Sequence, residues 1–319
     1  MASYNDSKSI VKTDEGELAQ AVAFDENEAK KAFDYLPISE TTRDDYKLRV
    51  GDFVEFIKIN GLNRNTLLDY RKHLEARTDY SISTKNKYFT TAKRYCGVLY
   101  NAHILPTDIT KDLSGVELKG FKQSRLHKKD GVSQAEVDRL ASYFRGLDES
   151  KQNLRLKAIF SLLIYQGLRQ VEIVRLDVSD LDLRAGKAFV QGKGRDDKEP
   201  IALHPYTVNA LQAYLTAYNK KSGAVFTCES NRAYGERLTT LSLRRTVKGV
   251  LKQLDIENST HGFRHYFTTN MIKNYHGDLL KVAHYTRHRR LDMLQVYNDA
   301  LDAEQDLPNY INAFEGVKL

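Results

Sequence analysis

A series of polar side chains in the second half of the chain has the types that phosphoryl transfer requires. In chain order they are Arg169, Lys193, His261, Arg264, His288 and Tyr297. A phosphodiester transition state spreads negative charge over its non-bridging oxygens, and two guanidinium groups can clamp these oxygens with paired hydrogen bonds. Each such preorganised donor is worth on the order of 3–4 kcal/mol. The set therefore predicts phosphoryl transfer in which arginines, and not a metal ion, stabilise the charge of the transition state.

The other members of the set can move protons and attack phosphorus. A lysine on a mobile hairpin can protonate a leaving 5′ oxygen, which suits Lys193 between Gly192 and Gly194. A tyrosine has an ordinary pKa near ~10 and needs cations or a base beside it to become a nucleophile. His261 and His288 can supply both.

Taken singly, these residues have ordinary structural explanations. Arg169 can cap a helix end at the surface, Lys193 can belong to common turn chemistry, and Tyr297 can be a core phenol among 19 tyrosines. His261 and Arg264, three residues apart, share one face of a helix. The order and the contexts of the whole set favour the catalytic interpretation.

Helices and one small sheet are expected to position the set. A capping box at Ser133-Gln-Ala-Glu136 begins a mostly helical domain that is expected to span 133–302. One strongly apolar helix ends at Gly167. Residues 187–191 and 199–203 predict an antiparallel β-hairpin whose turn carries Lys193. Further helices are expected within 205–220, 239–254 and 261–300.

The first part of the chain predicts a smaller helical domain. Residues 1–37 are acidic or mixed in charge with weak periodicity, and we interpret them as a partly disordered extension that can contain a short helix. Apolar residues at helical spacing predict three helices within 38–115, the third beginning near Ser83. Residues 116–132 are rich in cations and form the expected basic linker.

Length and composition agree with two domains. The chain has 319 residues, which is long for a single core, and 41% of them are hydrophobic. No apolar run is long enough to span a bilayer, so no membrane partner is expected. Cys96 and Cys228 are the only cysteines, which excludes a disulfide framework or a thiolate metal cluster and favours a reducing compartment. The net charge of +7 suits an anionic partner.

With these motifs in order, the chain resembles the tyrosine recombinase (phage integrase) family. Its catalytic domain typically shows Gly-Leu-Arg-x-x-Glu, a hairpin Lys, Thr-His-x-x-Arg-His, Gly-His, and a Tyr nine residues on. The matching residues are Gly167-Leu168-Arg169-Gln170-Val171-Glu172, Gly192-Lys193-Gly194, Thr260-His261-Gly262-Phe263-Arg264-His265, His288 and Tyr297. The resemblance covers 133–316, whereas the unit at 38–115 resembles the family's core-binding domain only by size, position and helix pattern.

The resemblance implies a course for the reaction. Tyr297 attacks the scissile phosphate and leaves a 3′-phosphotyrosine with a 5′-hydroxyl. Arg169 and Arg264 bind the phosphate oxygens, and Lys193 is the general acid toward the leaving oxygen. The covalent link conserves the bond energy, so neither ATP nor any cofactor is implied.

Four further residues have implied supporting roles. His261 and His288 hydrogen-bond the phosphate or assist proton transfer. Glu172 orients Arg169 or its surroundings. His265 contacts the residues that bind the phosphate and does not touch the phosphate itself.

The chain departs from the family pattern before the last histidine. The family usually has Leu-Gly-His there, whereas this chain has Thr286-Arg287-His288. The local backbone is therefore expected to differ. Arg287 is expected either to contact a DNA phosphate or to solvate a helix start.

Double-stranded DNA is the expected partner, held by two domains that close around it as a clamp. Most contacts should go to backbone phosphates. The predicted contacts are Lys85, Lys87 and Arg94 in the first domain, Lys122, Arg125, Lys128 and Lys129 in the linker, and Arg244, Arg245 and Arg287 in the second.

The resemblance also implies assembly. The family works as a tetramer on two paired sites, so a homotetramer with exchange of the C-terminal tail is implied. The tail, residues 303–319, has an apolar stripe that would dock on a neighbour; the alternative is that it packs on its own domain. Accessory DNA-bending or directionality factors are compatible with this scheme, and a cytoplasmic, nucleoid-associated location follows from it.

Three other interpretations stay open. His261 with His265, and His284 with His288, have the spacing of zinc ligands, although zinc would leave the arginines, the lysine and the tyrosine unexplained. A non-catalytic DNA-binding regulator would be favoured if an arginine or the tyrosine of the set were missing, and all are present. A type IB topoisomerase shares the chemistry and would relax DNA as a monomer.

Overall fold

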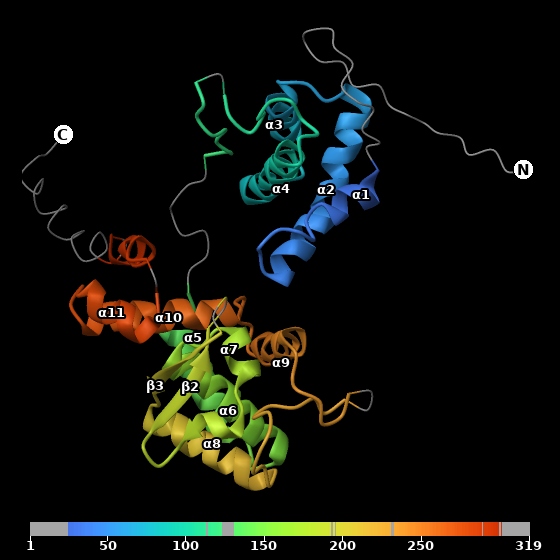
Figure 1. Cartoon of the computed structure of the whole chain (residues 1–319). Helices are drawn as coiled ribbons and strands as arrows, with labels where there is room; N and C mark the ends of the chain where they lie inside the picture. The colour runs from blue at the N-terminus through green and yellow to red at the C-terminus, as the bar shows by residue number, and fades with distance from the viewer. Residues whose placement is uncertain are drawn as a thin grey trace, which may run out of the picture. The chain divides into compact units, whose positions relative to one another are not determined.

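The computed structural model describes residues 25–112, 114–122, 131–192, 194, 196–230, 233–288, 290–299 and 301. Over these residues the chain is mainly helical with one three-stranded antiparallel sheet, which confirms the predicted fold class (Figure 1). It divides into two compact units, Met1–Ser124 and Arg125–Leu319, at a point inside the predicted linker. None of the helices in the described ranges is both long and apolar enough to cross a membrane.

The first unit is built from helices whose apolar faces meet in one core. The helices are α1 (Glu26–Lys31), α2 (Glu40–Asn60), α3 (Thr66–Ala76) and α4 (Ile82–Asn101). Ser39 and Ser81 cap α2 and α4, because each hydroxyl accepts a backbone N–H three residues on. The core includes Val50, Phe53, Leu67, Leu74, Phe89 and Cys96.

Part of the predicted N-terminal extension is folded. Helix α1 lies against α2, and Ala29 and Phe33, four residues apart, are fully buried. The rings of Phe33 and Tyr46 pack with their centroids 5.3 Å apart. This pair of apolar residues gives the segment a face to bury, so the packing of the first unit begins before residue 38. Residues 1–24 lie outside the described ranges.

The second unit places a small sheet among helices. Its elements are α5 (Gln134–Gly146), α6 (Lys151–Gln166), α7 (Gln170–Arg175), η1 (Val178–Asp180), β1 (Leu181–Asp182), β2 (Lys187–Gln191), β3 (Lys198–Ala202), α8 (Pro205–Ala217), α9 (Thr240–Gln253), α10 (Thr260–Asn274), α11 (Leu279–Thr286) and a helix over 292–299. The strand order is β1-β2-β3, and Ala188 pairs with Ile201. The predicted hairpin and the capping box at Ser133 are both present.

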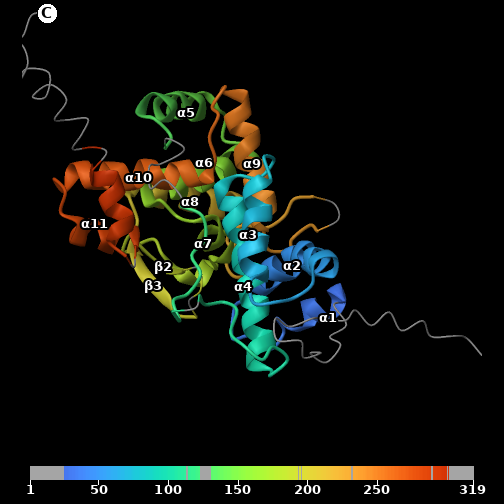
Figure 2. The same cartoon turned by 90° about the horizontal axis from the view of Figure 1, so that it is seen from above.

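Helix α6 is the central element of the second unit. Ile159, Leu162 and Leu163 are fully buried, and α8 and α10 both pack on this helix. Figures 1 and 2 show α10 running along one side of the unit with α11 next to it. A helix that is apolar nearly all round must be covered on most faces, which explains its position.

A small apolar cluster, separate from the main core, holds the last described helix. It consists of Ile272 from α10, Val282 from α11, Leu294 and Leu301. The Tyr297 side chain is partly buried against it. Because Leu294 and Tyr297 lie on the same helix, this cluster positions the predicted nucleophile.

Candidate active site

Arg264 lies at the centre of the charged cluster. It is only 4% exposed, and its guanidinium donates to the carbonyl of Gly167 at 2.8 Å and to the carbonyl of Thr286. Both carbonyls lie at helix C-termini, where backbone acceptors lack a partner within the helix. Arg264 therefore joins the ends of α6 and α11 to α10. Burial, and after it Arg169 and Arg287, lower the pKa of Arg264 to about 9, which still leaves it charged at neutral pH.

Gly167 makes the turn that presents Arg169. Its φ of +56° is in the left-handed region, and a Cβ there would lie 2.4 Å from the ring of Phe267. A glycine is therefore required at this position on both counts. Arg169 follows at the N-cap of α7 with its side chain 32% exposed, so it is more accessible than Arg264.

Glu172 is the buried counter-charge of the cluster. Its Oε2 accepts the Arg169 backbone N–H at 2.8 Å and Nη2 of Arg287 at 2.8 Å, and its Oε1 accepts Nη1 of Arg169 at 2.9 Å. Burial acts to raise the pKa of this carboxyl, but Arg287, the Arg169 N–H and Arg264 outweigh it, and the pKa is lowered. Glu172 is therefore ionised and contacts Arg169, as its expected role requires.

The expectation for Arg287 is corrected. Arg287 ends α11 in the left-handed conformation, with φ 57° and ψ 42°. This is the conformation that favours glycine at a helix C-terminus, and a side chain there costs about 1–2 kcal/mol. The side chain is 8% exposed and turns inward to Glu172, so it neither faces a DNA phosphate nor solvates a helix start. A strained arginine therefore stands where the family pattern has glycine.

Thr286 sets the hydrogen-bonding state of His288. The Thr286 hydroxyl donates to the carbonyl of Val282 at 2.8 Å and lies 2.7 Å from Nδ1 of His288. A hydroxyl has one hydrogen, so its oxygen accepts the Nδ1–H of His288, which leaves a lone pair on Nε2. Burial, and after it Arg264, Arg169 and Arg287, lower the pKa of His288 to about 3. His288 is therefore neutral, with the Nε2 lone pair available as a hydrogen-bond acceptor, but it is a weak base.

Tyr297 contacts a histidine directly. Its hydroxyl hydrogen-bonds with Nδ1 of His265, and the His265 ring meets His261 edge-on with centroids 4.5 Å apart. Burial raises the pKa of Tyr297 to about 12, although Arg264 acts to lower it. The phenol is thus protonated in this state. His265, expected behind the reacting groups, is a direct partner of the nucleophile.

Some residues of the cluster were missed from the sequence. Nε2 of Gln170 donates to the Thr260 hydroxyl and joins α7 to α10 beside the arginines. The signal for Thr260 was present, because it opens the Thr-His-x-x-Arg box. Thr286 gave no signal, because the family usually has leucine there.

Several predicted residues lie outside the described ranges. They are Lys193 in the hairpin turn, the linker cations Arg125, Lys128 and Lys129, and the tail 303–319. The two strands of the hairpin, β2 and β3, lie within the described ranges.

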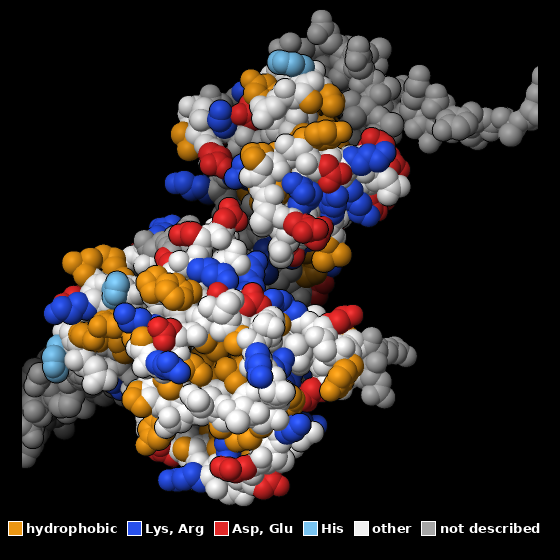
Figure 3. All heavy atoms as spheres, turned by 60° about the horizontal axis from the view of Figure 1, so that its bottom comes forward, with side chains coloured by type: hydrophobic (Ala, Val, Ile, Leu, Met, Phe, Trp, Pro, Cys, Tyr) orange, Lys and Arg blue, Asp and Glu red, His pale blue; other side chains and the backbone are white. Residues whose placement is uncertain are grey.

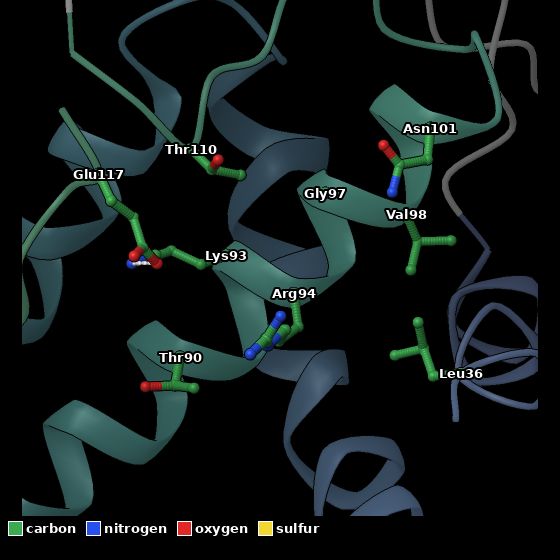
Figure 4. Close-up of a pocket in the computed structure, with 9 residues that line it drawn as sticks. All are labelled: Leu36, Thr90, Lys93, Arg94, Gly97, Val98, Asn101, Thr110 and Glu117. Carbon is green, nitrogen blue, oxygen red and sulfur yellow. Dashed lines mark hydrogen bonds and ion pairs between the residues drawn. The ribbon is translucent and has the colours of Figure 1, made fainter. Parts of the chain in front are cut away.

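The predicted DNA contacts of the first unit differ in their surroundings. Lys87, Lys122 and Arg94 are exposed, whereas Nζ of Lys85 donates to the Glu75 carbonyl at 2.8 Å. Figure 4 shows Arg94 at a pocket of about 290 Å³, where the neighbouring Lys93 pairs with Glu117 at 2.6 Å. Exposed Lys87 and Arg94 are seven residues apart on α4, and so lie on the same helix face.

In the second unit the remaining predicted contacts are on α9. Arg244 and Arg245 are exposed, while Leu243 and Val247 of the same helix are buried. Figure 3 shows basic side chains intermixed with acidic ones on the face it presents. Charge alone does not mark a DNA surface on that face. Arg244 and Arg245 remain candidate contacts because both are exposed on α9.

A zinc site of the kind that histidine spacing suggested is not formed within the described ranges. No three His, Cys, Asp or Glu side chains gather there in a way that could hold a metal ion. His261 instead packs edge-on against His265, and His265 hydrogen-bonds with Tyr297.

Comparison with known proteins gives one consistent result. Residues 132–304 match the model of the phage integrase family. The tyrosine recombinase XerD of Oceanobacillus iheyensis is 28% identical over 80% of this chain and 94% of its own length, and XerD of Shewanella oneidensis is 24% identical over 82% and 86%.

Solved structures share the fold. XerH recombinase bound to its difH substrate matches with a TM-score of 0.64 and 18% identity, covering 87% of this chain and 81% of that one. The Tn1549 transposon integrase with transposon right end DNA matches with a TM-score of 0.58 and 16% identity, covering 88% and 99%.

Proposed function

The chain belongs to the phage integrase family, the tyrosine recombinases, and we propose that it cuts and rejoins duplex DNA at specific sites through a 3′-phosphotyrosine. The observation that carries the proposal is the convergence of Arg169, Arg264 and a neutral His288 from three separate helical segments. Tyr297 lies near enough for Arg264 to oppose the effect of burial on its pKa. This combination suits a phosphate attacked by a phenol.

The proposed cleavage step balances as follows. The Tyr297 oxygen forms a bond to phosphorus while the bond from phosphorus to the 5′ oxygen breaks. The phenol proton passes to a neutral imidazole nitrogen; Nδ1 of His265 holds that hydrogen bond here, and Nε2 of His288 offers a second lone pair. Lys193 gives a proton to the leaving 5′ oxygen. Rejoining is the reverse, with the 5′-hydroxyl of another strand as the attacking group.

The two guanidiniums would bear the charge that develops on the phosphate oxygens. Arg264 is already held by two carbonyls, so it loses little freedom when the phosphate arrives. The tautomer that Thr286 favours makes Nε2 of His288 a hydrogen-bond acceptor, and not a donor to a phosphate oxygen. The lowered pKa of His288 makes it a weak base, so we propose Nδ1 of His265 as the acceptor of the phenol proton.

The assembly is part of the same proposal. We propose that the two units close as a clamp on duplex DNA, that four subunits act on two sites, and that the tail 303–319 docks on a neighbour. The XerH and Tn1549 integrase structures contain DNA, which supports DNA as the partner. The reaction needs neither ATP nor metal in this scheme, and it takes place in the cytoplasm, on the nucleoid. Helper proteins that bend DNA or set direction fit the scheme.

The test uses a nicked duplex that carries the chain's own cleavage site. Mapping covalent cleavage positions across the genome of origin defines that site. The nick lets the short fragment that carries the released 5′-hydroxyl diffuse away, so the wild-type chain should accumulate a covalent adduct in EDTA without ATP. Tyr297→Phe should form none, because the attacking oxygen is absent.

Tyr275→Phe is the matched control, since Tyr275 packs against the same small cluster as Tyr297. It should form the adduct at the wild-type level. No adduct from the wild-type chain, or an undiminished one from Tyr297→Phe, would refute the proposed function. Relaxation of a supercoiled plasmid without exchange between two sites would instead favour a topoisomerase.

A further inference from the structure

We propose that Arg287 is a positioning residue for the cleavage reaction, which holds the buried Glu172 so that Arg169 is presented to the phosphate. This inference rests on the proposed function. It concerns the residue at which the chain departs from its family, where glycine is usual. The departure has therefore introduced a third arginine into the site.

The contacts divide Glu172 between two arginines. Nη2 of Arg287 and the Arg169 backbone N–H both bind Oε2, at 2.8 Å each. Oε1 is left to accept Nη1 of Arg169 at 2.9 Å. Arg287, at the end of α11, fixes Oε2 and so fixes the plane of the Glu172 carboxylate. Because Oε1 binds Arg169, the orientation of the carboxylate sets the direction in which Arg169 points.

Burial assigns different tasks to the two arginines. Glu172 is 1% exposed and the Arg287 side chain 8%, whereas the Arg169 side chain is 32% exposed. Arg287 also donates through Nη1 to the Tyr285 carbonyl at 3.4 Å, a long bond that keeps it within its own turn. Arg169 is thus placed to meet a phosphate, and Arg287 to hold the group beneath it.

Charge supports the same division. The charged groups that act on Glu172 are Arg287 from the end of α11, Arg264 from α10 and Arg169 from the start of α7, and Arg287 has the largest effect among them in lowering its pKa, against burial. Three cations face one carboxylate. Without Arg287, Glu172 would be ionised over a narrower pH range and would hold Arg169 less firmly.

The test compares Arg287→Gln with Arg287→Lys in the full-length chain. Both substitutions keep a long side chain in the left-handed turn, so they differ mainly in charge. The matched control is His276→Gln, which places the same residue at another exposed left-handed position, with φ 47°. The readouts are single-turnover cleavage of the nicked duplex, its Kd, and the pH dependence of the cleavage rate.

We expect Arg287→Gln to slow cleavage by about 10- to 100-fold, the effect of a small misplacement of a reacting group. Its Kd should stay at the wild-type value. The pKa of Glu172 should rise, so the rate should begin to fall at a higher pH as the solution is acidified. Arg287→Lys should restore most of the rate and the wild-type pH profile, and His276→Gln should behave as wild type.

Two results would overturn the proposal. Cleavage by Arg287→Gln at the wild-type rate would show that Arg169 is positioned without Arg287. An equal loss of rate and of DNA affinity would show that Arg287 contacts DNA itself. Either result leaves the proposed function standing, because that function fails only when the wild-type chain forms no adduct.

Discussion

The two sides of the candidate active site are held by different parts of the second unit. The arginine side has Arg169 and Glu172 at the start of α7 and Arg264 on α10, and both helices are anchored in the main core. Arg287 joins this side from the end of α11, whose Val282 belongs to the small cluster. Phe263, next to Arg264, is fully buried and meets Phe160 edge-on with centroids 5.6 Å apart. The nucleophile side is the helix 292–299 with Tyr297, which rests on a much smaller cluster.

This difference separates two requirements of the reaction. Electrostatic stabilisation works best when the donors are fixed before the substrate arrives, and the arginine side has its bonds already made. A nucleophile must reach the phosphate and later release it. A helix with few buried contacts suits this task, because weakly packed regions open at low free-energy cost. The molecule thus combines a rigid charged frame with a lightly packed nucleophile.

The largest effect should come from breaking the rigid side. Arg264→Lys keeps a positive charge but cannot reach the carbonyls of Gly167 and Thr286 together and still face the phosphate. Single-turnover cleavage should fall by about 10²- to 10³-fold. Arg184→Lys, at an exposed position between β1 and β2, is the control and should leave the cleavage rate unchanged. A rate within a few-fold of wild type for Arg264→Lys would contradict the assignment.

Leu294→Ala loosens the small cluster on which the helix 292–299 rests. We expect it to slow cleavage by roughly 10-fold and hardly to change the global free energy of unfolding, because the small cluster can open locally. The comparison is Leu163→Ala in the main core, which should destabilise the protein by about 2–5 kcal/mol. Urea unfolding and cleavage of the nicked duplex measure the two effects. Equal destabilisation by both variants would remove the distinction between the two sides.

A smaller effect should follow from changing the tautomer of His288. Thr286→Val keeps the shape of the buried side chain but removes the oxygen that accepts the His288 Nδ1–H, so the imidazole can adopt either tautomer. Cleavage should slow several-fold, up to about 10-fold. Thr286→Ser keeps the hydroxyl and should cleave at close to the wild-type rate. If Ser and Val slow the reaction equally, the loss comes from packing and the tautomer argument fails.

Local patterns in the sequence predicted those parts of the fold that depend on local interactions. The capping box at Ser133 and the hairpin of residues 187–191 and 199–203 are recognisable from a few neighbouring residues, and both are present. The grouping of Arg169, Arg264 and His288 came from motif order, and the structure brings these residues together.

Features that depend on long-range pairing were not predicted. Arg287 looked like a surface cation because its partner, Glu172, lies 115 residues away in sequence. The short helix that the N-terminal extension could contain was not located, because its apolar residues, Ala29 and the following Phe33, become recognisable as a packing face when α2 is beside them. In both cases a tertiary contact, absent from any short window of sequence, decides the outcome.

Hydrogen exchange followed by mass spectrometry tests the contrast between the two sides most directly. Backbone amides of α10 around Phe263 and Arg264 should exchange at least about 100-fold more slowly than those of the helix 292–299, since only the former lie in the main core. Addition of the cleavage-site duplex should slow exchange in 292–299 and change α10 little. Equal protection of the two segments in the absence of DNA would contradict the account.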